Sequence, residues 1–176
     1  LVRPRLPLRV CRRAVPCALM SALLRTLARV FLRICFPQVK QLPPAPLAAW
    51  LTDSSRLQPL LLDVRQPEEF AVSHLTGARR VDFGSRAEDV LAGVPDGQPI
   101  VCYCAAGFRS SIMATRLARA SHKEVFNLEG AIFDWACEGR PLVCGDQPTR
   151  DVHPFNWLGR LLLPRDVRAS APSLRH

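Results

Sequence analysis

The first 52 residues contain no aspartate or glutamate, although the chain of 176 residues has 15 acidic side chains in all. The same segment holds nine of the 24 lysines and arginines, so the rest of the chain is balanced in charge. The formal net charge of +9 therefore belongs to one segment and does not mark the whole protein as a nucleic-acid binder. Because 48% of the residues are hydrophobic, the chain can bury a sizeable core and is not a disordered protein.

A regular cysteine framework is also missing. The seven cysteines are odd in number, irregularly spaced and placed mostly in apolar runs. This pattern excludes a disulfide-stapled scaffold and indicates a reducing compartment. Cys102 and Cys104 form the one close pair, and neither a second pair nor a histidine cluster completes a zinc site. We therefore expect no metal and no other cofactor.

No apolar run reaches the roughly 20 residues that a membrane-spanning helix needs, because Arg25, Arg29 and Arg33 interrupt the longest candidate. These arginines recur every fourth residue. The opposite face carries Leu23, Leu24, Leu27, Val30, Phe31 and Ile34. The pattern predicts a basic amphipathic helix. Three interpretations stay open: a transit peptide, a helix on an anionic membrane, or a helix packed on its own domain.

The location and start of the protein depend on which interpretation holds. We expect a cytoplasmic protein, with the mitochondrial matrix or the membrane periphery as the alternatives if the helix is a targeting or surface segment. Met20 lies directly before the periodic segment and is a candidate start residue.

Short apolar runs and helical patterns alternate through the middle of the chain. Strands are expected at residues 39–42, 60–65, 80–83, 100–103 and 125–128, and helices at 46–51, 68–74, 87–91, 110–120 and 132–137. Such alternation predicts a parallel sheet that is covered on both faces. Ligands of these sheets bind at the carboxyl ends of the strands.

The alternation stops after Val143. Residues 145–153 are predicted to be a polar linker, and residues 165–176 a frayed end. Between them, Trp157, Leu158, Leu161 and Leu162 recur at helical spacing. This stripe is expected to pack on the domain or on the basic helix, and binding of a partner protein is the alternative. The organisation predicted is a basic extension at 1–36, a domain at 37–145 and a tail at 146–176.

Cys104 begins a loop at residues 104–111, between the buried strand and the helix that follows. Such a loop turns backbone N–H groups toward one point, and the helix adds the positive end of its dipole, so an anion is stabilised there. The simplest anion is the thiolate of Cys104, the nucleophilic form of the thiol. Gly107 permits a positive φ, Arg109 adds a fixed cation, and Ser110 or Ser111 is expected to cap the helix.

A buried structural cysteine is the ordinary alternative to a nucleophile at such a position. Cys102 is interpreted as a core residue of this kind. It lies two residues before Cys104 and hence on the same face of the strand.

Five segments resemble one known family. They are residues 61–70, 73–78, 104–111, 127–135 and 139–142. In order and spacing, from about residue 39 to residue 143, they resemble a single-domain rhodanese. The resemblance implies an α/β, rhodanese-like fold with a parallel five-stranded sheet, helices on both faces, and helical extensions at both ends. The chain departs from the family pattern at Thr76, where proline is common, and at Ala131, where a second glycine is common.

The resemblance also implies a sulfurtransferase. Cys104 would attack a sulfane donor such as thiosulfate and become a persulfide, and cyanide or a thiol would then accept the sulfur. Cys104 and Arg109 would be the catalytic residues. The loop around the persulfide would comprise Ala105, Ala106, Gly107, Phe108 and Ser110. Asp63, Arg65 and His74 would be structural supports, with catalysis by His74 as a general base and a purely structural ion pair of Arg109 as alternatives.

Two other functions compete with this one. The first is a non-catalytic or sulfur-carrier rhodanese module that docks on a partner protein. The second is a cysteine-dependent phosphatase or arsenate reductase, which would have five residues between cysteine and arginine, whereas four separate Cys104 from Arg109. We expect small sulfur donors and acceptors as partners, no nucleic acid, and a membrane or protein contact through the terminal helices as a further option.

Overall fold

The structure is a computed structural model that describes residues 15–121 and 123–169, with side chains from residue 20 onward. The beginning of the predicted basic extension and residues 170–176 of the predicted frayed end lie outside the described residues. Among the described helices, none is both long and apolar enough to cross a bilayer.

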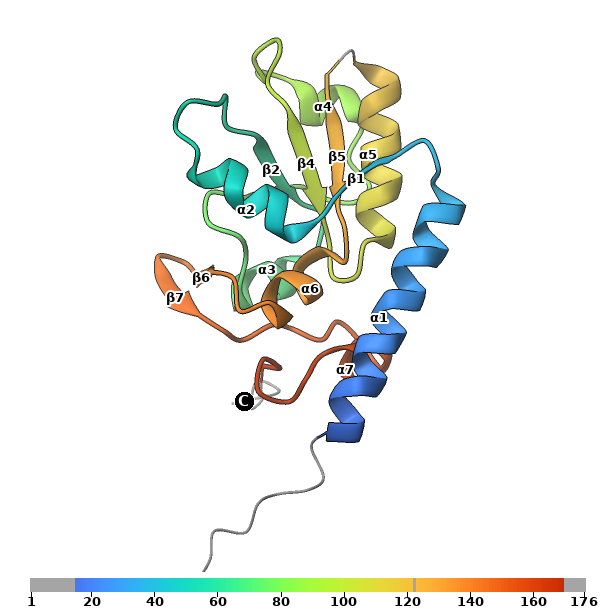
Figure 1. The fold of residues 1–176 in the computed structure, drawn as a ribbon. Coiled ribbons are helices and arrows are strands. Elements are labelled where there is room, and N and C mark those ends of the chain that lie inside the picture. The colour runs from blue at the N-terminus through green and yellow to red at the C-terminus, as the bar shows by residue number, and fades with distance from the viewer. Residues whose placement is uncertain (1–14, 122, 170–176) are drawn as a thin grey trace, which may run out of the picture.

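A five-stranded parallel sheet forms the centre of the fold (Figure 1). Its strands are β1 (Lys40–Leu42), β2 (Leu60–Asp63), β3 (Arg79–Arg80), β4 (Ile100–Tyr103) and β5 (Val125–Leu128). The spatial order is β1-β5-β4-β2-β3, and every pairing is parallel. The predicted α/β class and five-stranded sheet are confirmed.

Seven helices and a hairpin complete the described chain. The helices are α1 (Val15–Cys35), α2 (Pro44–Thr52), α3 (Pro67–Val72), α4 (Ala87–Leu91), α5 (Phe108–Ala120), α6 (Ala131–Cys137) and α7 (Trp157–Leu162). The hairpin pairs β6 (Leu142–Cys144) with β7 (Gln147–Thr149) in antiparallel register. Proline at the start of α2 and of α3 fixes a helical φ without the loss of a hydrogen bond.

The sheet is buried on both faces because successive side chains of a strand point to opposite sides. Leu61 packs with one apolar cluster, which includes residues of α2 and α6. Leu62 packs with a second cluster, which includes residues of α4 and α5. Cys102 and Cys104 both belong to the second cluster, as their spacing predicts.

The prediction of a polar linker at residues 145–153 was wrong. Glycine at position 145, with a φ of +57°, turns the chain into the β6–β7 hairpin. Val152 then pairs with Arg168 through an isolated bridge and is fully buried. Residues 165–169, predicted to be frayed, are therefore held against the domain. Local polarity hid this arrangement, because the pairing partner lies 16 residues further along the chain.

Helix α1 packs on the domain with its basic face. The Nε atom of Arg25 lies 2.7 Å from Oδ1 of Asp134, and Arg33 pairs with Glu129 at the same distance. Arg25 also donates a hydrogen bond of 2.9 Å to the carbonyl oxygen of Leu162. Figure 1 shows α1 running past the first turn of α5 to α7. Of the three interpretations of this helix, packing on the domain describes residues 20–35.

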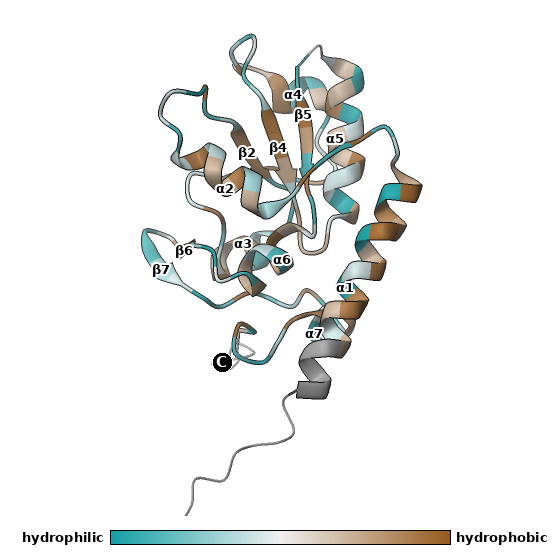
Figure 2. Ribbon diagram, in the orientation of Figure 1, coloured by the Kyte–Doolittle hydropathy of each residue, from teal (hydrophilic) through white to brown (hydrophobic). Residues whose placement is uncertain are grey.

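The apolar side chains of α1 and α7 lie mostly outside the core. Figure 2 shows apolar and polar residues on different sides of α1. Most of the apolar side chains of α1 are exposed, and so are Trp157, Leu158 and Leu161 of α7. Only Leu162 of the predicted α7 stripe is buried. The expectation that this stripe packs against the domain was wrong for three of its four residues, because Leu162 is the one stripe residue that belongs to the apolar core cluster.

Gly130 provides a test of the turn that leads into α6. Its φ is +68°, and an added Cβ would overlap the carboxyl group of Asp134. We expect Gly130→Ala to lower the free energy of unfolding by about 3 kcal/mol, because backbone strain and overpacking add. Gly97→Ala is the control, since Gly97 has a φ of +75° with no atom near its Cβ position. Gly97→Ala should lower the free energy of unfolding, measured in urea, by about 1 kcal/mol. Equal losses would contradict the packing of this turn.

Candidate active site

Cys104 lies directly after β4, and its side chain is almost completely buried, with 2% of the residue exposed. The N–H of Gly107 donates a hydrogen bond of 3.1 Å to its Sγ atom, and the hydroxyl of Ser110 lies 3.4 Å from the same sulfur. Both donors come from the start of α5, so the sulfur sits at the positive end of that helix. Backbone N–H groups and the helix dipole at such a position stabilise a bound anion.

Gly107 sets the shape of the loop. Its φ of +107° is open to glycine and strained for other residues, and an added Cβ would lie 2.8 Å from Cδ1 of Leu32. The prediction that Ser110 or Ser111 caps the helix was wrong, because Gly107 is the N-cap residue and both serines lie within the helix. Their hydroxyls donate hydrogen bonds of 3.2 and 2.7 Å to the carbonyl oxygen of Gly107.

The turn into α6 holds the other side of the loop. The N–H of Ile132 donates to the carbonyl oxygen of Cys104, and the N–H of Phe133 to that of Ala105, both at 3.2 Å. Ala131, which starts this helix, has a φ of +52° in the left-handed region. This conformation explains why glycine is common at that position in the resembled family, and it places the departure next to the site.

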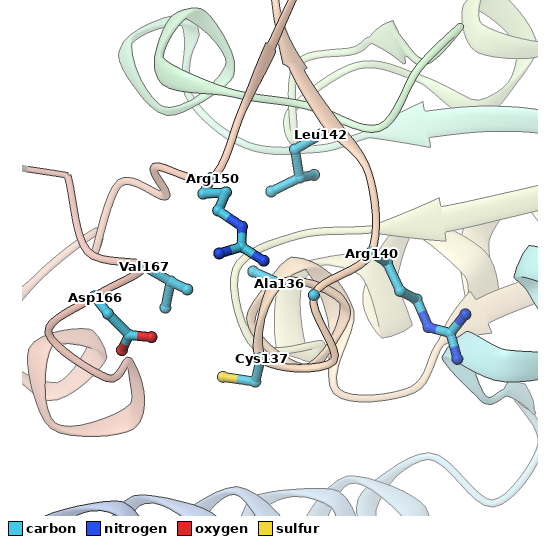
Figure 3. A pocket seen from close by; sticks show the side chains of 8 residues that line it. Ala136, Cys137, Arg140, Leu142, Arg150, Asp166 and Val167 are labelled. Carbon is cyan, nitrogen blue, oxygen red and sulfur yellow. The ribbon is translucent and has the colours of Figure 1, made fainter. Parts of the chain in front are cut away.

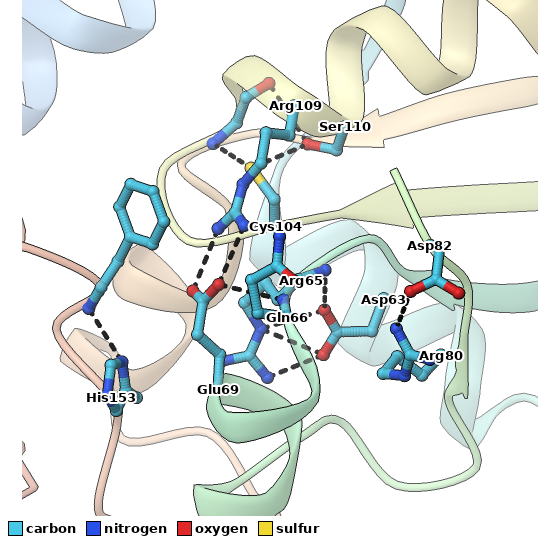
Figure 4. Close-up of polar contacts among 12 residues, drawn as sticks. Asp63, Arg65, Gln66, Glu69, Arg80, Asp82, Cys104, Arg109, Ser110 and His153 are labelled. Atoms are coloured by element: carbon cyan, nitrogen blue, oxygen red, sulfur yellow. Dashed lines mark hydrogen bonds and ion pairs between the residues drawn. The ribbon is translucent and has the colours of Figure 1, made fainter. Parts of the chain in front are cut away.

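Arg109 makes a bidentate ion pair with Glu69, which is buried at the start of α3. The two N–O distances are 2.8 and 3.0 Å (Figure 4). Glu69 also accepts a hydrogen bond from the N–H of Gln66. Burial alone would lower the pKa of Arg109, but the hydrogen bond and charge of Glu69 hold that pKa above its ordinary value. The guanidinium is therefore a fixed cation beside the cysteine loop.

The ring of Phe155 packs against the same cation. The carbon centre of the Arg109 guanidinium lies 4.4 Å from the centroid of the Phe155 ring. Phe155 has a φ of +64°, which is strained for a bulky residue, and its N–H donates to Nδ1 of His153. Glu69 and Phe155 were not identified from the sequence. The helix start after Pro67 was a signal for Glu69, whereas nothing local marked Phe155.

Asp63 and Arg65 form a pair with no exposed side-chain surface at the end of β2. Nη2 of Arg65 lies 2.7 Å from Oδ2 of Asp63 (Figure 4). The same nitrogen donates a hydrogen bond of 2.5 Å to the carbonyl oxygen of Ser73. The pair therefore ties the end of β2 to the end of α3. Since α3 carries Glu69, the pair fixes the partner of Arg109.

His74 makes its contacts away from the sulfur. Its ring stacks on Phe70 with centroids 3.8 Å apart, and Nδ1 lies 3.1 Å from the carbonyl oxygen of Phe70. Its backbone pairs with Val143 in both directions. These contacts favour the structural interpretation of His74 over general-base catalysis.

The loop is covered by segments from both ends of the described chain. Leu32 of α1 lies against Gly107, and the ring of Phe36 meets the ring of Phe108 edge to face at 5.6 Å. Phe155 covers Arg109 from the C-terminal side. A ligand must therefore be small, or these segments must move, before it can contact Cys104.

A separate pocket of about 110 Å³ lies between α6 and the C-terminal segment (Figure 3). Cys137, Arg150 and Asp166 line it, whereas Cys104 and Arg109 do not. Burial raises the pKa of Cys137, which keeps this thiol in its protonated, weakly nucleophilic form. In the part of the chain that the structure describes, no three metal-ligating side chains gather at one point.

Comparison with known proteins identifies the family. The profile of the rhodanese-like domain matches residues 44–138, more than half of the chain. The thiosulfate sulfurtransferase GlpE of Pseudomonas aeruginosa is 32% identical over 75 residues, which cover 43% of this chain and 67% of GlpE. The probable adenylyltransferase/sulfurtransferase MoeZ of Mycobacterium tuberculosis is 30% identical over 99 residues, 56% of this chain but 25% of MoeZ.

A solved structure agrees with this assignment at the level of the fold. A thiosulfate sulfurtransferase from Pseudomonas aeruginosa has a TM-score of 0.58 at 20% identity, with 73% of this chain and 24% of that chain covered. The chain belongs to the rhodanese-like domain family, and the resemblance seen in the sequence is confirmed. Relatives within this family carry sulfurtransferase names, so sulfur transfer is the kind of activity that the family membership supports.

The buried pair beneath the site should be far more important for stability than a similar pair at the surface. We expect Asp63→Asn to lower the free energy of unfolding by about 3–5 kcal/mol, because it leaves the charge of Arg65 buried without a counter-ion. The control is Asp82→Asn, which breaks the largely exposed pair of Asp82 with Arg80 and should cost less than about 1 kcal/mol. If urea unfolding gives similar losses of free energy for Asp63→Asn and Asp82→Asn, the buried pair is not a main contributor to the stability of the domain.

Proposed function

We propose that the protein is a sulfurtransferase that moves a sulfane sulfur from thiosulfate or a persulfide donor to a thiol or cyanide, through a persulfide on Cys104. The observation that carries this proposal is the sulfur of Cys104 held at the start of α5, with the N–H of Gly107 3.1 Å away. Arg109 stands beside the same loop as a fixed cation. Membership of the rhodanese-like family supports the assignment.

Each half of the cycle is a displacement at sulfur. The Cys104 thiolate attacks the outer sulfur of thiosulfate, a new S–S bond forms, and sulfite leaves with the electron pair of the old S–S bond. The acceptor then attacks the outer sulfur of the persulfide, and the Cys104 thiolate leaves. The Gly107 N–H and the Ser110 hydroxyl are placed to stabilise negative charge on the attacking and departing sulfur.

The size of the loop supports sulfur over a phosphate-like anion. Four residues separate Cys104 from Arg109, and Leu32 closes the loop from outside. A tetrahedral oxyanion needs more donors and a wider loop to surround its oxygens, whereas one sulfur atom fits a smaller space. We assign the loop from Ala105 to Phe108, with Ser110, to the persulfide. The supporting roles go to Asp63, Arg65 and His74.

Removal of the nucleophile tests this proposal. Cys104→Ser should lower thiocyanate formation from thiosulfate and cyanide at least about a thousandfold, because a hydroxyl cannot form a persulfide. Cys144→Ser alters an exposed thiol of the hairpin and should leave the rate unchanged. Comparable activity of the two variants would contradict the assignment of Cys104.

The same assay separates the competing functions. A protein that acquires one sulfur atom on Cys104 but passes none to cyanide or small thiols would be a sulfur-carrier module. Efficient hydrolysis of an aryl phosphate without any reaction with thiosulfate would identify a phosphatase instead.

Arg109 should act on the anionic donor, in addition to its pairing with Glu69. We expect Arg109→Gln to raise the KM for thiosulfate about tenfold or more, since a charge-assisted hydrogen bond contributes about 1.5–3 kcal/mol. The matched control is Arg116→Gln, which removes an exposed arginine two turns further along α5. An unchanged KM for Arg109→Gln, together with lower thermal stability, would show that Arg109 is purely structural.

A further inference from the structure

Helix α1 carries an exposed apolar surface over residues 20–34, within the part whose side chains the structure describes. Its members, each more than half exposed, are Met20, Leu23, Leu27, Val30, Phe31 and Ile34. We call this set the outer stripe. At helical periodicity the six positions fall within about 100° of one another, so they form one continuous face. The stripe spans about 21 Å along the helix, at a rise of about 1.5 Å per residue.

The outer stripe points away from the domain. The opposite side of α1 is buried at Ser21 and Leu32, and its arginines pair with acidic residues of the domain. A helix that only packs on its own domain would bury its apolar face and expose its charges. Here the reverse is true, so the domain leaves the apolar face free for another partner.

The charge of the sequence that precedes the stripe indicates the chemistry of that partner. Residues 1–14 contain five arginines and no acidic residue, and α1 itself contains no acidic residue. A positively charged segment next to an apolar helical face is the combination that holds peripheral proteins on anionic lipid.

Helix α7 adds a second exposed apolar group beside α1, against which it packs. Trp157 is the most exposed of its apolar side chains, and Arg160 on the same helix is also exposed. Tryptophan prefers the boundary between water and lipid, because its ring is apolar and its N–H is polar.

We propose that the outer stripe is a membrane-binding surface that holds the rhodanese-like domain on an anionic bilayer. The apolar side chains enter the boundary between headgroups and acyl chains, and the arginines of residues 1–14 attract acidic headgroups. A second copy of the chain is a poorer partner, since it carries the same excess of positive charge.

Co-sedimentation of the full chain with lipid vesicles tests the proposal. The probes are vesicles of phosphatidylcholine alone and vesicles with about 30% phosphatidylserine, at physiological salt. We expect binding to the anionic vesicles to be about tenfold tighter than to the neutral ones, and to weaken as salt rises. Removal of residues 1–14 should abolish most of this preference.

A matched pair of leucines tests the stripe itself. Leu27 is 56% exposed on the outer stripe, and Leu57 is 60% exposed in the loop before β2. Leu27→Gln should weaken binding to anionic vesicles severalfold, whereas Leu57→Gln should leave it unchanged. Because both leucines are exposed, both variants should keep the thermal midpoint of the parent protein.

Three outcomes would overturn the proposal. The first is no binding of the parent protein to either kind of vesicle. The second is equal binding by Leu27→Gln and the parent protein. The third is a concentration-dependent dimer in ultracentrifugation that Leu27→Gln abolishes, with no vesicle binding, which would assign the stripe to a second copy of this chain.

Discussion

The hydrogen bond from the N–H of Gly107 to the sulfur of Cys104 is the contact on which the rest of the site depends. It exists because Gly107 adopts a φ of +107° and begins α5 directly above the sulfur. A buried strand brings the cysteine to this point, and the turn into α6 holds its carbonyl group. The fold therefore places the sulfur of Cys104 at the N-terminus of α5, and the charge of Arg109 is fixed nearby through Glu69.

The terminal segments connect this site to the surface of the molecule. Leu32 and Phe155, which lie 123 positions apart in the chain, contact the same loop at Gly107 and at Arg109. The ion pairs of Arg25 and Arg33 hold α1 in place, and they turn its apolar face outward. The same helix thus closes the candidate site on one side and presents the outer stripe on the other.

The sequence predicted β2, β4 and β5 well because these strands are short and mostly apolar runs. The strand expected at residues 80–83 is shorter and lies at Arg79–Arg80, because its pairing with β2 and not an apolar pattern defines it. The sequence also placed Cys104 and Arg109 together, since the loop that carries both is continuous in the chain. Contacts between residues far apart in the chain could not be predicted from the sequence. Arg109 pairs with Glu69, and Val152 pairs with Arg168. Both contacts join distant segments, and no periodic pattern in the sequence predicts that these segments lie together. The direction of α1 was missed because amphipathicity alone favours burial of the apolar face, and the acidic residues that reverse it lie in α6 and just before it.

The central claim is that Cys104 carries one additional sulfur atom, as a persulfide, during the reaction. Fragment mass spectrometry tests this most directly, after the protein is incubated with thiosulfate, freed of excess donor and alkylated. The account predicts one additional sulfur atom on Cys104 and none on the other six cysteines, including the neighbouring Cys102, whose burial raises its pKa and keeps it protonated. Additional sulfur on Cys102 or on an exposed cysteine, or none on any cysteine, would contradict it.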